Sequence, residues 1–230
     1  MKILWVAAIL ALTGCVTSRA SGPVLIIGDS ISVGYTRYAQ EAMPCISHAY
    51  SPHHSRNARD SSYLLGLLPT YFGDGKKYAV IQFNVGLWDI AHRIPDSGSE
   101  FVLGDVNKYP ITTSPEDYRL NLQAIIDTLH SLQPQAMLIF ATTTDVPADS
   151  LGRRPEDVDA YNRIAIQVMA DNGIPIDDLH GWMESYPYLH NFNNPIKVHY
   201  TKAGYRLLAQ KLVDTLSPLV SCDAIASVGM

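Results

Sequence analysis

Apolar residues along this chain form short continuous runs that alternate with longer amphipathic segments. Continuous runs of this kind are typical of strands buried on both faces of a parallel sheet. Five strands are predicted, at residues 23–28, 45–49, 78–85, 136–142 and 174–178. A helical period in the intervening segments predicts five helices, at residues 31–42, 61–72, 115–132, 155–172 and 202–217.

The regular alternation of strands and helices predicts an α/β fold with a doubly wound parallel sheet. We expect one domain over residues 23–230. In such a sheet the loops that follow the strands form the functional edge. Segments without a helical or strand pattern lie at residues 87–113, 143–154 and 185–199, and we expect them to form the walls of a pocket.

The first residues have the pattern of an export signal. Lys2 precedes an apolar stretch at residues 3–12, which is too short to span a membrane as a helix. The motif Leu12-Thr13-Gly14-Cys15 that follows resembles a bacterial lipobox, and the resemblance implies cleavage before Cys15 and acylation of that residue. The alternative is an ordinary cleaved signal that happens to contain a cysteine.

On this interpretation residues 1–14 are a lipoprotein signal peptide and residues 15–22 are a tether. The protein would then be lipid-anchored in a bacterial cell envelope, facing the periplasm or at the outer membrane. In that oxidising compartment Cys45 and Cys222 remain, and both are expected at the end of the sheet opposite the functional edge. We predict a disulfide between them, with two buried free thiols as the alternative.

Charge narrows the range of partners. Charged residues make up 17% of the chain, the formal net charge is −5, and no basic run occurs. Because phosphate binding needs clustered Lys and Arg, nucleic acid is not expected as a partner. The sequence does not determine an oligomeric state.

Two separated segments carry candidate chemistry. Gly28-Asp29-Ser30 ends the first predicted strand and places Ser30 at the start of a helix, where the helix dipole and free N–H groups favour developing negative charge. Asp and Ser are also preferred helix caps, so this segment alone fits either a cap or a nucleophile. Near the C-terminus, His199-Tyr200-Thr201 and Gly204 precede the last helix and place a histidine in a loop.

Together with YAVIQFNVGLWDI at residues 78–90, these motifs resemble the SGNH/GDSL hydrolases. The nearest match is a subgroup with Asn-x-Gly-Leu-x-Asp in this third block, which Thr142-Thr143-Thr144 and Tyr161-Asn162 also fit. The resemblance covers residues 23–217 and implies a three-layer flavodoxin-like sheet of five strands in the order 2-1-3-4-5. It further implies ester hydrolysis, with Ser30 as nucleophile, His199 as general base, and neither cofactor nor metal.

The oxyanion hole departs from the family pattern. The family's third-block asparagine falls at Trp88, so its side-chain amide donor is absent. The indole N–H of Trp88 and the amide of Asn84 are possible replacements, with packing and loop support as their alternative roles. The backbone N–H groups of Ser30 and of Asn57, at the second-block glycine position, are the other candidate donors.

The third member of the triad is also missing. The family has an aspartate three residues before the histidine, where this chain has Ile196, and no acid occurs between Glu184 and His199. The sequence Asp177-Asp178-Leu179-His180 has the right spacing, but it lacks the helix with a glycine that should follow. We therefore predict a Ser–His dyad, in which a backbone carbonyl, Asn193 or Asn194 orients the ring.

Other polar residues are less specific. His48, His53 and His54 show no metal-ligand spacing and are expected in a solvated loop beside the pocket. Arg153 and Arg154 fit either an anionic group of the substrate or a solvated surface. The expected pocket walls are rich in tyrosine, and we predict that these side chains stack on sugars: Tyr109, Tyr118, Tyr186, Tyr188 and Tyr200.

The combined prediction is a serine esterase that acts on short acyl esters, in particular acetyl esters, of carbohydrates, with a small molecule or a glycan ester as its substrate. One alternative is a lysophospholipase or thioesterase with an apolar groove in the same crevice. Another is a non-catalytic glycan-binding envelope lipoprotein, which the missing aspartate would favour.

Overall fold

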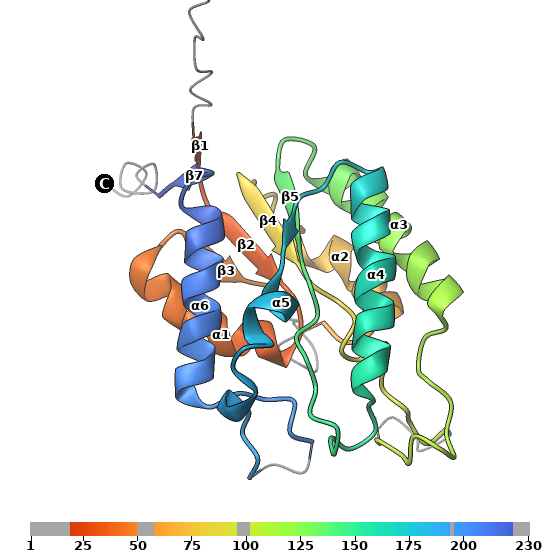
Figure 1. The fold of residues 1–230 in the computed structure, drawn as a ribbon. Helices are drawn as coiled ribbons and strands as arrows, with labels where there is room; N and C mark the ends of the chain where they lie inside the picture. Colours follow the sequence, from red (N-terminus) through yellow and green to blue (C-terminus); the bar gives the residue numbers. More distant parts are fainter. Residues whose placement is uncertain (1–18, 50–57, 96–101, 194–195, 223–230) are drawn as a thin grey trace, which may run out of the picture.

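The computed structural model describes residues 19–49, 58–95, 102–193 and 196–222. At its centre is a parallel sheet of five strands in the order β3-β2-β4-β5-β6 (Figure 1). The strands are β2 (Val24–Ile27), β3 (Ile46–His48), β4 (Val80–Phe83), β5 (Met137–Ala141) and β6 (Ile176–Asp177). This is the predicted order 2-1-3-4-5, and the predicted α/β fold is confirmed.

The sheet is covered on both faces, which explains why its strands are continuous apolar runs. Helices α1 (Ser30–Ala42) and α6 (Lys202–Leu216) pack together on one face. Helices α2 (Ser61–Tyr71), α3 (Pro115–Leu132) and α4 (Pro155–Asp171) follow one another across the other face (Figure 1). All residues of β2 and β4 are buried between the two helical layers.

The helices begin where the sequence contains capping residues. The side chains of Asp29, Asp60, Ser114 and Thr201 each accept a hydrogen bond from an N–H group in the first turn of α1, α2, α3 and α6. Each cap satisfies one of the backbone donors that a helix start leaves without a partner. The observed helix bounds therefore lie within one residue of the predicted ones.

Short elements were not predicted. Part of the expected tether forms strand β1 (Ala20–Ser21), which pairs in parallel with β7 (Val220–Ser221) in a separate small sheet. After β6 the chain forms helix α5 (Leu179–Met183) and a 3₁₀ turn, Pro187–Leu189. Two to five residues are too few to show a period of hydrophobicity, so the sequence pattern carries no signal for these elements.

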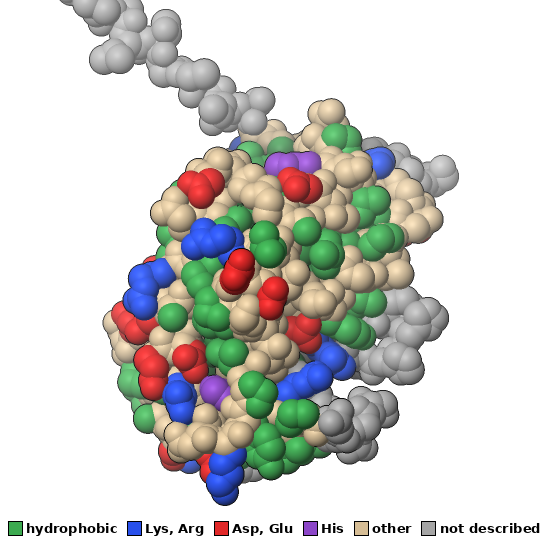
Figure 2. Space-filling model, turned by 90° about the vertical axis from the view of Figure 1, so that its right-hand side faces the viewer, with side chains coloured by type: hydrophobic (Ala, Val, Ile, Leu, Met, Phe, Trp, Pro, Cys, Tyr) green, Lys and Arg blue, Asp and Glu red, His purple; other side chains and the backbone are tan. Residues whose placement is uncertain are grey.

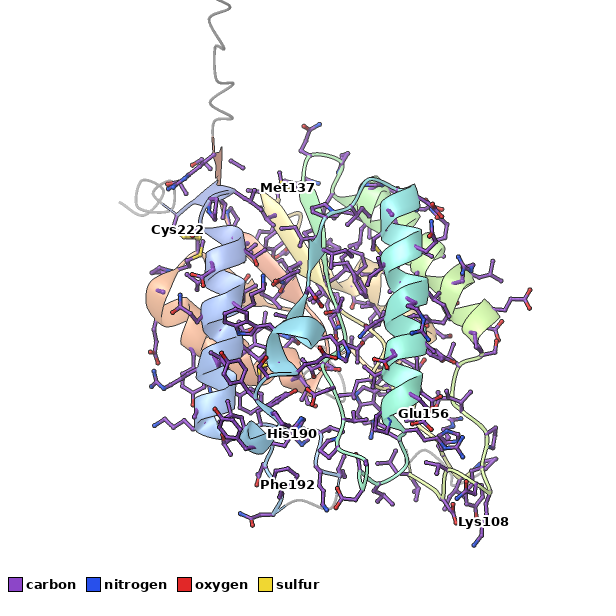
Figure 3. The ribbon with its side chains drawn as sticks, in the orientation of Figure 1. Lys108, Met137, Glu156, His190, Phe192 and Cys222 are labelled. Carbon is purple, nitrogen blue, oxygen red and sulfur yellow. A yellow bond between two sulfur atoms is a disulfide. The ribbon has the colours of Figure 1, made fainter. Side chains whose placement is uncertain are left out.

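A disulfide joins Cys45 to Cys222, with 5.2 Å between the two Cα atoms. It links the start of β3 to the segment after α6, next to the small sheet of β1 and β7. Cys222 and His190 lie at opposite ends of the molecule (Figure 3). The disulfide therefore lies at the end of the sheet opposite the carboxyl ends of the strands, where both cysteines were predicted.

The outer surface carries charges of both signs. On the side that α3 and α4 cover, acidic and basic side chains are interspersed among apolar and polar ones (Figure 2). Among the described residues, no helix has both the length and the apolar character needed to cross a membrane.

Candidate active site

Ser30 lies at the carboxyl edge of the sheet, directly after the turn that ends β2. The helix cap at this turn is Asp29, because its buried carboxylate accepts from the N–H of Ile31 at 2.8 Å. Burial raises the pKa of Asp29 to about 6, against hydrogen bonds from the N–H groups of Ile31 and Ser32. Since Asp29 caps the helix, the hydroxyl of Ser30 is left for another partner.

That partner is His199, in the loop that precedes α6. Its Nε2 lies 3.0 Å from Oγ of Ser30, although 169 positions separate the two residues in the chain. Burial, followed by the positive charge of Arg153, lowers the pKa of His199 below its usual value. The ring is therefore neutral at pH 7, and with a proton on Nδ1 its Nε2 can accept the serine proton.

No acid completes a triad in the described residues. In the described residues, no carboxylate accepts a hydrogen bond from Nδ1 of His199. No carbonyl or side-chain amide there is hydrogen-bonded to this nitrogen either. Ile196, at the position of the family's aspartate, uses its carbonyl oxygen to accept from the hydroxyl of Ser150. Asn193 is exposed, and Asn194 lies outside the described residues.

The Asp-x-x-His sequence at residues 177–180 has other partners. Asp177 is fully buried and binds Gln82 at 2.6 Å and Lys211 at 3.2 Å. His180 pairs with Asp159 at 3.1 Å. These side chains hold β6 and α5 against their neighbours, and in the described part of the chain none of them is hydrogen-bonded or ion-paired to His199.

A network that the sequence did not suggest holds the backbone of His199. The N–H of Asn191 donates to the carbonyl of His199 at 2.7 Å, and His190 pairs with Tyr200 in an antiparallel bridge. The ring of His190 stacks on that of Tyr200, with 4.3 Å between ring centroids. Asp145 binds both, at 3.1 Å from Nε2 of His190 and 2.8 Å from the hydroxyl of Tyr200.

This network makes Asp145 the anchor of the histidine loop. Burial would raise the pKa of Asp145, but the hydrogen bonds from His190 and Tyr200 outweigh burial and hold the pKa below its usual value. The carboxylate is therefore charged at neutral pH and holds its two partners firmly. Asp145 is 45 and 55 positions from these partners, so no local spacing reveals the cluster.

Removing this anchor is expected to misplace His199. We predict that Asp145→Ala lowers kcat on an activated ester by about 10-fold, because small displacements of a catalytic group are costly to the rate. Asp159→Ala is the matched control, since it breaks an exposed Asp–His pair elsewhere on the fold. Equal kcat values for the two variants would show that Asp145 does not position the histidine.

The candidate oxyanion donors differ in their hydrogen-bond partners and in their exposure. The backbone N–H of Ser30 lies at the start of α1, where donors are available. The side-chain amide of buried Asn84 donates to the carbonyl of Ala141 at 2.7 Å, which matches its alternative role of supporting the loop. Trp88 is partly exposed beside this loop, and Asn57 lies outside the described residues.

The rest of the third block shapes the loop after β4. A Cβ at Gly86 would lie 2.2 Å from Oγ1 of Thr143, and the residue has φ of 151°, so only glycine fits there. The carboxylate of Asp89 is buried and accepts from the N–H of Ser61 at 2.9 Å and from its hydroxyl. Asp89 thus ties the loop to the start of α2, and it does not serve His199.

Two buried carboxyl groups should make stability depend on pH. Burial raises the pKa of Asp89 to about 7 and that of Asp29 to about 6. Both bind a proton more tightly in the folded than in the unfolded chain, so stability falls as pH rises through these values. We predict a loss of about 1–3 kcal/mol in the free energy of unfolding between pH 5 and pH 8.

Denaturant titrations across this pH range measure the effect. Asp89→Asn keeps the shape of the side chain and removes its titration, so its pH dependence should be clearly flatter than that of the wild type. A wild type that becomes more stable as pH rises from 5 to 8 would contradict this prediction.

The structure corrects part of the predicted tyrosine rim. Tyr118 is fully buried and donates to the carbonyl of Val85, and Tyr200 is 3% exposed. Tyr109 and Tyr186 are partly exposed, and Tyr188 is 68% exposed. Tyr118 and Tyr200 therefore support the site from inside, and only the other three tyrosines can meet a ligand.

The remaining histidine prediction is also corrected. His48 is 8% exposed at the end of β3, where Nε2 lies 2.7 Å from the hydroxyl of Ser32. Burial lowers the pKa of His48 to about 4. His53 and His54 lie outside the described residues. In the described part of the chain, no group of three or more His, Cys, Asp or Glu side chains is arranged to hold a metal ion.

A doubly wound parallel sheet, with a serine after its first central strand bonded to a histidine before its last helix, defines a hydrolase of the SGNH type. Residues 26–207, well over half of the chain, match the GDSL-like Lipase/Acylhydrolase family. The chain belongs to this family and is an ester-hydrolysing enzyme. Among curated proteins, no significant sequence match was found.

Solved structures share the fold at low sequence identity. A lipase/acylhydrolase from Enterococcus faecalis aligns with a TM-score of 0.61 and 16% identity, over 84% of this chain and 94% of that chain. The acetyl xylan esterase AlAXEase aligns with a TM-score of 0.62 and 16% identity, over 84% and 99%. The psychrotrophic esterase EstA from Pseudoalteromonas sp. aligns with 0.59 and 14% identity, over 85% and 97%.

Proposed function

We propose that this protein is a serine esterase that hydrolyses short acyl esters, in particular acetyl esters, of carbohydrates. Ser30 is the nucleophile and His199 the general base. The observation that carries the proposal is the 3.0 Å contact between Oγ of Ser30 and Nε2 of His199 at the start of α1. A structural neighbour described as an acetyl xylan esterase is consistent with this substrate class.

The proposed reaction follows from this geometry. Oγ of Ser30 bonds to the acyl carbon while its proton passes to Nε2 of His199, and the carbonyl electron pair moves onto oxygen. The intermediate collapses, the C–O bond to the alcohol breaks, and the imidazolium returns the proton to the leaving alkoxide. Water then attacks the acyl-enzyme by the same steps and releases the acid.

The space behind the Ser30 turn offers no room for a long acyl chain. An interior cavity there is lined by Asp29, Ile31, Ser32 and Tyr35 and has a volume of about 10 Å³. That volume holds about one water molecule, so a long chain cannot enter the protein at this place.

Exposed aromatic rings near the histidine loop favour a sugar as the alcohol part. Tyr188 and Phe192 are 68% and 52% exposed, and Trp182 and Tyr186 lie beside them. Phe192 and His190 lie together at the end of the molecule that carries the loops (Figure 3). Such rings can stack on sugar faces.

The acyl group is tested with carbohydrate esters of graded chain length. We expect kcat/KM to fall by about 10-fold or more from acetyl to octanoyl, because the interior behind the Ser30 turn has no room for a long chain. A kcat/KM that rises with chain length would instead favour a lysophospholipase or thioesterase. Glycan binding without turnover of any ester would favour the non-catalytic alternative.

The lipid anchor is part of the same proposal. Residues 1–18 lie outside the described chain, and β1 leads directly into the amino end of β2, whereas Ser30 follows its carboxyl end (Figure 1). A tether from Cys15 would thus attach at the end of the sheet away from Ser30, so the site would face away from the membrane. Cys15→Ser should release the protein from the membrane fraction or block its processing, and unchanged fractionation would count against the anchor.

A further inference from the structure

Arg153, in the loop between β5 and α4, is an arginine with an interior guanidinium. Its side chain is 3% exposed, and Nε donates to the carbonyl of Leu87 at 2.7 Å. Among the described residues, no carboxylate pairs with Arg153, and its buried Nη1 has no hydrogen-bond partner. The neighbouring Arg154 differs, because its Nη2 binds the carbonyl of Val106 and the side chain of Asn107, each at 2.9 Å.

Keeping a guanidinium charged in the interior without a paired anion is unfavourable. Burial lowers the pKa of Arg153 to about 10, and the charge of Asp29 opposes this effect. The group is still positively charged at neutral pH. An interior cation with an unused donor calls for an anion that arrives only during function.

The position of Arg153 indicates which anion. Leu87, which holds Nε, belongs to the loop after β4 and lines the same small cavity as Asp29 and Ile31, on either side of Ser30. The guanidinium carbon lies 5.8 Å from the ring centroid of Trp88. Trp88 stands where the third block of SGNH hydrolases has the asparagine that donates to the oxyanion. The buried donor therefore lies beside the place where a donor is missing.

We propose that Arg153 is a catalytic residue that donates to the oxyanion formed when Ser30 attacks the ester carbonyl; this rests on the proposed esterase function. As the Ser30 Oγ–carbon bond forms, the proton goes to His199 and the negative charge to the former carbonyl oxygen. The guanidinium stabilises that charge and returns to its free state when the C=O bond re-forms. No further reactant is needed.

This role also accounts for a Ser–His pair without an acid. In a triad the carboxylate stabilises the imidazolium that forms in the transition state. Here the cation stabilises the other new charge, the oxyanion, which forms at the same moment. Burial is the main cause of the lowered pKa of His199, and the charge of Arg153 adds to it by repelling the imidazolium. The arrangement therefore favours catalysis only if the oxyanion lies closer to Arg153 than the ring does.

The test compares Arg153→Met and Arg153→Lys with the matched control Arg154→Met, using the full-length protein and p-nitrophenyl acetate. We expect Arg153→Met to lower kcat by about 100–1,000-fold with little change in KM, and Arg153→Lys to lower it less. In both Arg153 variants folding is checked by thermal melting. Arg154→Met should keep kcat close to the wild-type value.

The pH profile gives a second measurement that a merely structural role would not change. Removing the cation lets the pKa of His199 rise, so the acid limb of kcat/KM should move to higher pH in Arg153→Met and stay in place in Arg153→Lys. If Arg153→Met does not fold, Arg153→Gln replaces it, because Gln keeps an N–H donor and removes the charge.

Three outcomes overturn the inference. One is an unchanged kcat in a folded, uncharged variant, and another is an acid limb that does not move. The third is a loss that appears only in KM and only for esters bearing a carboxylate, which would make Arg153 a binding site for an anionic substrate group. A wild type without esterase activity would instead refute the proposed function itself.

Discussion

Ser30→Ala and His199→Ala are each expected to lower kcat/KM on an activated ester by about 10³-fold or more. The two residues share one proton through a 3.0 Å contact, so neither can promote the reaction without the other. The double variant should therefore be little slower than either single variant. Purified variants assayed side by side with p-nitrophenyl acetate measure both effects.

Additive losses would show that the two residues act independently. Ser32 provides a matched control for folding and specificity, since its hydroxyl lies 2.7 Å from Nε2 of His48. This second Ser–His pair is 1% and 8% exposed and out of reach of substrate. A loss of all activity in Ser32→Ala without a loss of stability would indicate that Ser32, and not Ser30, is the nucleophile.

Ile196→Asp is expected to raise kcat by about 10–100-fold, because it restores a carboxylate at the family's position. The carboxylate can accept from Nδ1–H of His199 and stabilise the imidazolium. It should also raise the pKa of His199, so the acid limb of kcat/KM should move to higher pH. Both quantities come from a pH–rate profile of the purified variant.

The side chain of Ile196 is partly buried, so this substitution can lower stability by about 1–3 kcal/mol. Thermal melting checks that the variant is folded at the assay temperature. Ile196→Asn is the matched control, since it has the same shape as Asp and no charge. Equal kcat values for Asn and Asp at this position would show that the charge of an acid is not what the site lacks.

The sequence predicted the sheet and the Ser30–His199 pair because both leave strong patterns. The strands are largely apolar, and α1, α2, α3 and α6 each begin at a capping side chain. Helix α4 begins at Pro155 and has acidic residues in its first turn, but no side-chain cap. At Ser30 the sequence alone fitted either a cap or a nucleophile. The structure assigns the cap to Asp29, which leaves the serine hydroxyl to His199.

What the sequence did not show depends on contacts between distant segments. Asp145, His190 and Tyr200 form their cluster only when the loop after β5 meets the histidine loop. The burial of Arg153 likewise depends on the carbonyl of Leu87, 66 positions away. Neither feature changes the local pattern of polar and apolar residues.

The burial of Tyr118, by contrast, could have been predicted from the local sequence pattern. It lies on the same face of α3 as Leu122, Ile125 and Leu129, at helical spacing, and all four are fully buried. The prediction that Tyr118 lies on the pocket rim rested on the residue type and not on the helical spacing. The helical period correctly predicts its burial.

Covalent labelling can test whether Ser30 is a nucleophile activated by His199. Incubation with a fluorophosphonate probe, followed by intact-mass measurement and peptide mapping, tests it most directly. We expect one adduct, on Ser30, which is absent from Ser30→Ala and present in Ser32→Ala. A wild type that takes up no probe, or an adduct that persists in Ser30→Ala, would contradict this assignment.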